Sequence, residues 1–218
     1  MTIVQYGGRG LGAFVGVLLL TAQWSSAGAE GSSDVTACRT EREPQRGIDA
    51  CSRVIADASL PASARAAALQ TRGHIYGRTR RRDLALLDFT QAIEIEPQNP
   101  FGYKTRGYAY STMEDFERAL TDYGEAIRLD PQDAAAYRER GDVRLIQRRY
   151  EEARADYATA IRLKPPGSSF GQCQASASLT NAFFHCTHVT LDDTQPEAAR
   201  AHAQRRLDDM TGARGPKR

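Results

Sequence analysis

The feature that most constrains this chain is a pattern that recurs every 34 residues over its central part. Five columns share this period, and each column holds one kind of side chain in three successive units. The columns are Gly73, Gly107 and Gly141; Ala85, Ala119 and Ala153; Phe89, Tyr123 and Tyr157; Ala92, Ala126 and Ala160; and Pro97, Pro131 and Pro165. A fixed period of this length indicates a repeat protein, and we place its units at residues 66–99, 100–133 and 134–167.

The residues within each unit predict two helices joined by a turn. In the middle unit we expect helices over residues 101–112 and 114–129, and helices this short are stable only when they pack against others. Gly107 leaves room for a close helix crossing beside Tyr123, and Pro131 ends the second helix because it cannot continue the hydrogen-bond ladder. Since each unit leaves an apolar face that only its neighbour can cover, the units should stack into an all-α solenoid.

This pattern resembles the tetratricopeptide repeat family. In that family a small residue stands at position 8, an aromatic residue at 11, alanine at 20 and 27, an aromatic residue at 24 and proline at 32. Tyr76 and Tyr110 occupy position 11 of the first two units, whereas the third has Arg144, a departure that indicates weaker internal packing or a different neighbour. The resemblance implies an α-solenoid of helix-turn-helix repeats with N- and C-terminal capping helices.

The resemblance also implies a concave groove, lined by the first helix of each unit, that binds a peptide or a partner helix. Family positions 2, 5, 9, 12 and 13 point into this groove. In this sequence they include Gln70, His74, Arg78, Phe101, Lys104, Tyr108, Ser111, Arg138, Asp142 and Ile146. The alternative is that these residues form only the solvated face of each helix, with Arg138 and Asp142 as an i, i+4 ion pair.

One known groove chemistry of the family does not fit this sequence. The clamp that holds chaperone C-terminal carboxylates needs lysine, asparagine and arginine at five positions. Those positions hold Gln70, His74, Thr105, Ala135 and Glu139. A glutamate would repel a carboxylate, so we expect no chaperone-tail receptor of that type.

The first 29 residues predict a cleavable signal peptide. Arg9 precedes a short apolar run over residues 11–20, and the small residues at 27–29 match a cleavage site. The run is about half the length of a membrane span. A retained anchor, or lipidation of Cys38, is the alternative. We therefore expect export to the periplasm or secretion, with no stable membrane insertion.

Four cysteines fit that compartment. They are Cys38, Cys51, Cys173 and Cys186, and four cysteines allow three disulfide connectivities. Export makes disulfides the default expectation. The rival is a metal site, because His185, Cys186 and His188 place three potential ligands close together.

Aligning the chain with the repeat family suggests how the cysteines pair. Residues 47–51 align with residues 119–123, which puts Cys51 at position 24 and Cys38 at position 11. A disulfide would then replace the paired aromatic residues and staple a degenerate N-terminal repeat at residues 30–65. We predict the local pairs Cys38–Cys51 and Cys173–Cys186. Stapled leading helices also resemble exported tetratricopeptide proteins of alphaproteobacterial type.

The C-terminal part is expected to cap the array over residues 168–211. Within it, residues 171–191 match no repeat column and fit either a packed helix or short strands. Ala199, Ala203, Leu207 and Met210 then form one apolar face of a final helix. Residues 212–218 are expected to be a disordered tail.

Composition and motifs exclude several classes of function. The formal charge is only +2, which disfavours a nucleic-acid binder, and no P-loop, dinucleotide, zinc-protease or hydrolase motif occurs. We expect no enzyme activity, no metal and no cofactor. The predicted function is an exported adaptor or scaffold for protein–protein contact. The alternatives are a self-assembling structural module and an envelope enzyme or metal-binding protein that uses residues 173–188.

Overall fold

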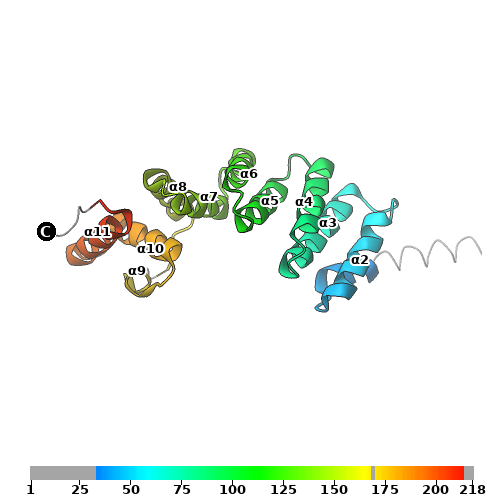
Figure 1. The fold of residues 1–218 in the computed structure, drawn as a ribbon, viewed down its shortest axis with the longest axis horizontal. Coiled ribbons are helices and arrows are strands. Elements are labelled where there is room, and N and C mark those ends of the chain that lie inside the picture. The colour runs from blue at the N-terminus through cyan, green and yellow to red at the C-terminus, as the bar shows by residue number, and fades with distance from the viewer. Residues whose placement is uncertain (1–32, 168–169, 214–218) are drawn as a thin grey trace, which may run out of the picture.

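The computed structural model describes residues 33–167 and 170–213. These form an elongated stack of helices that follow one another in sequence order from α2 to α11 (Figure 1), and they include no strand. Residues 33–40 form a first helix. The others are α2 (Pro44–Ala56), α3 (Ala62–Arg78), α4 (Arg82–Ile95), α5 (Pro100–Thr112), α6 (Phe116–Leu129), α7 (Ala134–Ile146), α8 (Tyr150–Leu163), α9 (Phe170–Ala175), α10 (Leu179–Leu191) and α11 (Glu197–Thr211).

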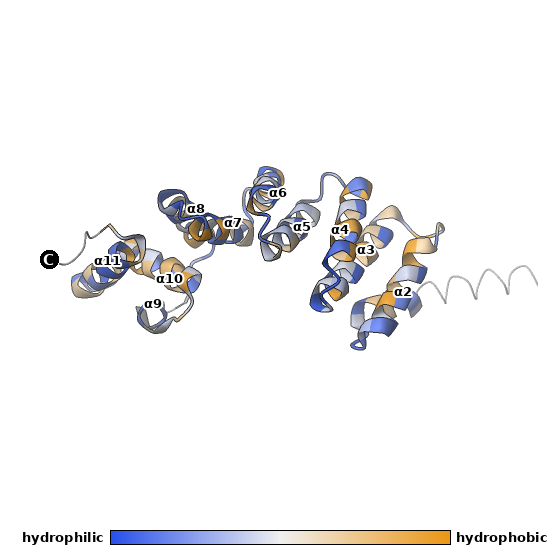
Figure 2. Cartoon of the chain, in the orientation of Figure 1, coloured by the Kyte–Doolittle hydropathy of each residue, from blue (hydrophilic) through white to orange (hydrophobic). Residues whose placement is uncertain are grey.

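The predicted all-α solenoid is confirmed. The three units of the sequence pattern are the helix pairs α3–α4, α5–α6 and α7–α8, and the second helix of each pair packs on the first helix of the next. Each labelled helix carries both hydrophobic and hydrophilic residues (Figure 2). The alanine and aromatic columns are buried in all three units. The core is a row of clusters between neighbouring helices, and the one around α8 and α10 is larger than the others along the described part of the array.

Side-chain caps account for the starts of several helices. Asn99, Asp115 and Asp133 cap α5, α6 and α7, because their side chains accept hydrogen bonds from main-chain N–H groups of the first turn. The prediction that the second helix of the middle unit starts at Glu114 is wrong. Glu114 has φ 60° in the turn, so α6 begins two residues later, at Phe116.

The glycine column marks the tightest contact between the paired helices. A Cβ added at Gly73 would lie 2.6 Å from a ring atom of Phe89, and one at Gly141 would lie 2.7 Å from Tyr157. At Gly107 the nearest atoms of Asp122 and Tyr123 are 3.2 Å away. The predicted crossing at position 8 is therefore present, and it is tighter in the outer units than in the middle one.

Replacing Gly141 by alanine is expected to lower the free energy of unfolding by about 1–3 kcal/mol. The Tyr157 ring cannot move away, because it is fully buried and its hydroxyl donates to Asp142. Urea denaturation measures the effect. The control is Gly124→Ala on α6, where an added Cβ meets nothing within 4 Å and alanine should stabilise by about 0.5–1 kcal/mol. Equal unfolding free energies for the two variants would contradict this packing.

Disulfides staple both ends of the array. Cys38 bonds Cys51 on α2, with Cα atoms 4.6 Å apart, and Cys173 on α9 bonds Cys186 on α10, with Cα atoms 4.7 Å apart. The predicted local pairing is therefore present in the structure. Both bonds span 13 residues of sequence and join a short helix to the helix that follows it.

The C-terminal segment resolves the choice left open by the sequence. Residues 179–191 form the helix α10, which packs on α8 and pairs with α11, while α9 contacts both α10 and α11. Ala199, Ala203 and Leu207 of α11 are buried in this cluster, with Met210 packed against it, as predicted.

Two sequence expectations lie mainly outside the described residues. The predicted signal peptide at residues 1–29 falls wholly outside them, and the predicted tail is described only at Gly212 and Ala213. Within the described ranges, no helix combines the length and the apolar character that crossing a bilayer requires.

Candidate binding groove

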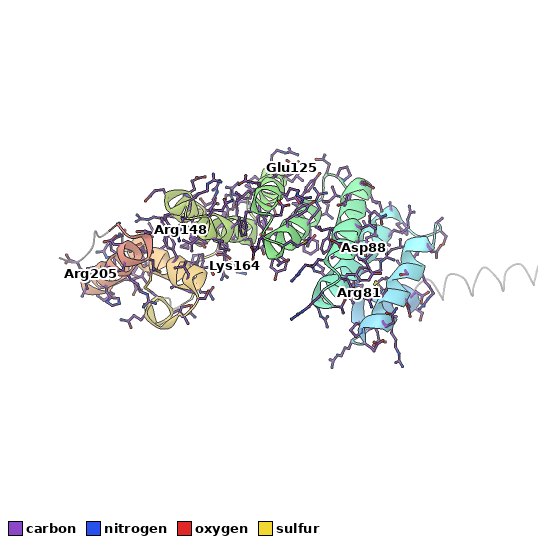
Figure 3. The ribbon with its side chains drawn as sticks, in the orientation of Figure 1. Arg81, Asp88, Glu125, Arg148, Lys164 and Arg205 are labelled. Atoms are coloured by element: carbon purple, nitrogen blue, oxygen red, sulfur yellow. A yellow bond between two sulfur atoms is a disulfide. The ribbon has the colours of Figure 1, made fainter. Side chains whose placement is uncertain are left out.

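A buried arginine–aspartate pair fixes the first helix of every repeat against the second. The pairs are Arg72–Asp88, Arg106–Asp122 and Arg140–Asp156. In the first, Nη2 of Arg72 lies 2.7 Å from Oδ1 of Asp88 and Nε lies 2.9 Å from Oδ2. Asp88 lies between α3 and α4 (Figure 3). A bidentate pair fixes the relative orientation of its two side chains. These pairs therefore fix the rotation of α3, α5 and α7 about their own axes, and with it the face of each helix that is exposed to solvent.

The first two arginines also reach the preceding helix. Nη1 of Arg72 donates to the Ser52 hydroxyl at 2.8 Å, and Nη1 of Arg106 donates to the Thr90 hydroxyl at 3.3 Å. Each guanidinium thus joins its own repeat to the helix that precedes it. The arginines and aspartates recur every 34 residues, so the period that revealed the other columns would also have revealed this network.

The third repeat builds the network differently. Gly124 stands where Thr90 stands one repeat earlier and offers no hydroxyl. Arg144 joins instead: its Nη1 lies 2.6 Å from Oδ2 of Asp156, and its Nη2 lies 3.5 Å from Glu152. The departure from the family pattern at position 11 therefore adds ion pairs within the repeat.

Among the predicted groove residues, Arg138 connects α7 to the C-terminal helices. Its Nη2 donates to Asn181 at 2.8 Å, and its guanidinium lies 4.9 Å from the centre of the Phe184 ring. No ion pair links Arg138 to Asp142 in the described part of the chain; the Asp142 carboxylate accepts the Tyr157 hydroxyl at 2.6 Å. The alternative of an i, i+4 pair is therefore not realised.

Two further groove residues are held by contacts within the array. Nζ of Lys104 lies 2.5 Å from Oδ2 of Asp133, the N-cap of α7, and 5.7 Å from the centre of the Phe101 ring. Gln70 is buried. Lys104 cannot meet a partner without giving up its contacts, and Gln70, at 8% exposure, presents almost no surface to one.

Three carboxylates lie close together at α7: those of Asp133, Glu139 and Asp142. Burial, together with the nearby carboxylates of Asp133 and Asp142, raises the pKa of Glu139 to about 7, and one of its oxygens is buried without a hydrogen bond. Burial also raises the pKa of Asp142. Since the pKa of Glu139 is higher in the folded chain than in the unfolded chain, ionising it as the pH rises toward 7 costs stability.

Three predicted groove residues meet at one pocket. His74 and Arg78 from α3 and Tyr108 from α5 line a cavity of about 400 Å³, which we call the α3–α5 pocket. Its inner wall includes the buried residues Ala85 and Phe89. The Tyr108 side chain is 57% exposed. This pocket offers an apolar wall, an exposed aromatic ring and cations in one place.

The other predicted groove residues lie near or beyond this pocket. The Phe101 ring is exposed, with its centre 6.3 Å from that of His74. The Ser111 hydroxyl donates to the main-chain carbonyl of Tyr108. Ile146, at the end of α7, is exposed.

Sequence reasoning missed two arginines of the α3–α5 pocket. Arg80 and Arg82 also line it, from the turn between α3 and α4 and from the start of α4. Arg81, labelled at that turn in Figure 3, lies with its guanidinium 5.9 Å from the centre of the Tyr76 ring. Four arginines between residues 78 and 82 were visible in the sequence. The family positions alone did not include the turn.

The predicted rival metal site does not form around Cys186. This sulfur is bonded to Cys173, so its thiolate is not available as a ligand. Within the described ranges, no group of three or more His, Cys, Asp or Glu side chains is arranged to hold a metal ion.

Comparison with known families agrees with this geometry. Residues 66–99 match one family model described as tetratricopeptide repeat, and residues 104–168 match another. The chain contains tetratricopeptide repeats. The three helix pairs α3–α4, α5–α6 and α7–α8 overlap these matches, so the tetratricopeptide array includes the residues of the predicted groove. A comparison with curated protein sequences gave no match.

Two of the solved structures similar to this chain share its fold over most of its length. A tetratricopeptide repeat protein from Parabacteroides merdae has 14% identity and a TM-score of 0.60, covering 87% of this chain and 68% of that chain. The MamA protein has 16% identity and a TM-score of 0.58, covering 88% of this chain and 98% of that chain. The first tetratricopeptide domain of Spaghetti (RPAP3), bound to an HSP90 peptide, has 30% identity and a TM-score of 0.47, covering 48% of this chain and 83% of that chain.

Proposed function

We propose that this chain is an exported adaptor or scaffold whose tetratricopeptide groove binds a peptide or a helix of a partner protein. The observation that carries the proposal is the α3–α5 pocket, where the exposed ring of Tyr108 borders a cavity of about 400 Å³. Exposed aromatic rings and arginines beside a pocket are typical anchors of protein interfaces. Repeat arrays offer extended concave surfaces for such contacts.

Export is part of the proposal and has separate support. All four cysteines form disulfides in the structure, and disulfides persist in the periplasm or outside the cell but rarely in a reducing cytosol. The predicted signal peptide at residues 1–29 is consistent with this compartment.

Replacing Tyr108 by alanine is expected to weaken partner capture about tenfold while leaving the melting temperature nearly unchanged. The matched control is Leu87→Ala, because Leu87 on α4 is 53% exposed and does not line the pocket. Quantitative capture from the periplasmic fraction compares wild type with both variants. Proteins that wild type and Leu87→Ala retain, and Tyr108→Ala loses, are groove partners. If both variants capture as wild type does, the groove is not the binding site.

Arg138 is a less informative position for this test. Its contacts with Asn181 and Phe184 join α7 to α10, so alanine at this position would change stability as well as binding.

The alternative function is self-assembly of the chain. Light scattering over a range of concentrations tests it, because the measured mass of a self-assembling chain grows with concentration.

A further inference from the structure

The α3–α5 pocket is distinguished from the rest of the array by its charge. Arg78, Arg80 and Arg82 all line it, and its lining residues include no aspartate or glutamate. The ion pairs formed among the described residues involve none of these three arginines. By contrast, the arginines that join the helices of each repeat all have a carboxylate partner.

This arginine triplet belongs to the first repeat alone. The corresponding residues of the second repeat are Thr112, Glu114 and Phe116, and those of the third are Ile146, Arg148 and Tyr150. The triplet is therefore no requirement of the repeat fold, which forms without it twice in the same chain.

Arg80 occupies a backbone conformation that favours glycine. Its φ is 62°, in the left-handed region, as are those of Glu114 and Arg148 at the same place in the other repeats. A residue with a Cβ pays about 1–2 kcal/mol there, and glycine avoids most of that cost. All three turns therefore carry this strain, and only in the first repeat does the strained residue also line the pocket.

The apolar part of the pocket adds a second kind of contact. Phe89 is buried at the pocket, the His74 ring meets Phe89 edge-on with ring centres 5.3 Å apart, and Tyr108 and Ala109 of α5 also line it. A ligand that fills this space must therefore combine an apolar group with negative charge at its edge.

We infer that the α3–α5 pocket is the anchor subsite for an acidic peptide segment, in which Asp or Glu residues flank an apolar side chain. The inference rests on the proposed peptide-binding function and adds the class of partner. The apolar side chain enters between Phe89 and Tyr108, and the flanking carboxylates pair with the three guanidinium groups. Arginine suits this role because its planar fork can hold a carboxylate through two parallel hydrogen bonds.

A random dodecapeptide display library, selected on the full oxidised chain, tests the class of ligand. The selected peptides should be enriched in Asp and Glu on both sides of an apolar residue. A second selection on the triple variant Arg78→Gln, Arg80→Gln and Arg82→Gln should lose this enrichment. Enrichment of basic peptides, selection of peptides without a charge preference, or no selection at all would overturn the inference.

Two matched glycine substitutions separate ligand contact from folding. Arg80→Gly and Glu114→Gly relieve the same backbone strain, so neither variant should melt below wild type. Fluorescence anisotropy with one selected peptide should show about tenfold weaker binding for Arg80→Gly and unchanged binding for Glu114→Gly. Replacing the acidic residues of that peptide by Gln and Asn should weaken binding to wild type, and so should added salt.

The same measurements distinguish failure of this inference from failure of the proposed function. If Arg80→Gly binds the peptide as wild type does but Tyr108→Ala loses it, the groove binds peptides without the arginine subsite and the inference is wrong. If Arg80→Gly and Tyr108→Ala both bind as wild type does, the peptide lies elsewhere and both proposals fail.

Discussion

Replacing Asp156 by alanine is expected to lower the free energy of unfolding by about 3–5 kcal/mol, the cost of breaking a buried ion pair by removing one partner. Asp156 is 3% exposed and accepts hydrogen bonds from two guanidinium groups, those of Arg140 and Arg144. Without the carboxylate, Arg140 stays partly buried with no countercharge, and Arg144 keeps only the Glu152 carboxylate at 3.5 Å. Asp122 pairs with Arg106 alone. Replacing Asp122 by alanine should therefore lower the free energy of unfolding by less than replacing Asp156 does.

Urea denaturation of the two aspartate variants measures this effect. Hydrogen exchange should place the loss of protection in α7 and α8 for Asp156→Ala, because each repeat contacts only its neighbours. The control is Asp193→Ala, whose carboxylate is 95% exposed in its pair with Arg200 and should leave stability nearly unchanged. An Asp156 variant as stable as this control would show that the ion-pair network contributes nothing net to the fold.

Removing either disulfide is expected to cost about 3 kcal/mol in the chain-entropy model, because each closes a loop of similar, short length. The bonds Cys38–Cys51 and Cys173–Cys186 both span 13 residues. The double variant Cys38→Ala, Cys51→Ala should loosen α2, and the double variant Cys173→Ala, Cys186→Ala should loosen α9 and α10. In both cases the central repeats should keep their structure, because neighbouring units hold them.

Limited proteolysis of the two double variants should show cleavage near the end that lost its bond. Non-reducing peptide mapping of the exported wild-type protein provides the direct check of pairing. A peptide linking Cys38 to Cys173, or free thiols in the exported protein, would contradict the stapled caps. Identical proteolysis patterns for both variants and wild type would show that the bonds do not hold the ends of the array.

The sequence by itself determined the repeat architecture, because every residue of the pattern packs against a residue of its own unit or of the next unit. A glycine at position 8 and a ring at position 24 specify the crossing of two adjacent helices, as in Gly141 and Tyr157. The local disulfide at Cys38 and Cys51 followed from the same positions. Turn geometry was harder to predict. Arg80 and Glu114 both adopt a left-handed backbone conformation, and neither arginine nor glutamate is a residue type that indicates this conformation.

Only the tertiary structure decided which of the predicted groove residues are exposed and which are held by other side chains. Arg138 and Asn181 are 43 residues apart, and α10 matches no repeat column, so no period in the sequence encodes their contact. Lys104 is likewise held by the N-cap residue of α7, Asp133. The α3–α5 pocket required the turn before α4 to lie beside α5, which brings Arg80 toward Tyr108. Periodicity fixes contacts that every repeat makes, whereas a binding site depends on contacts that one repeat makes alone.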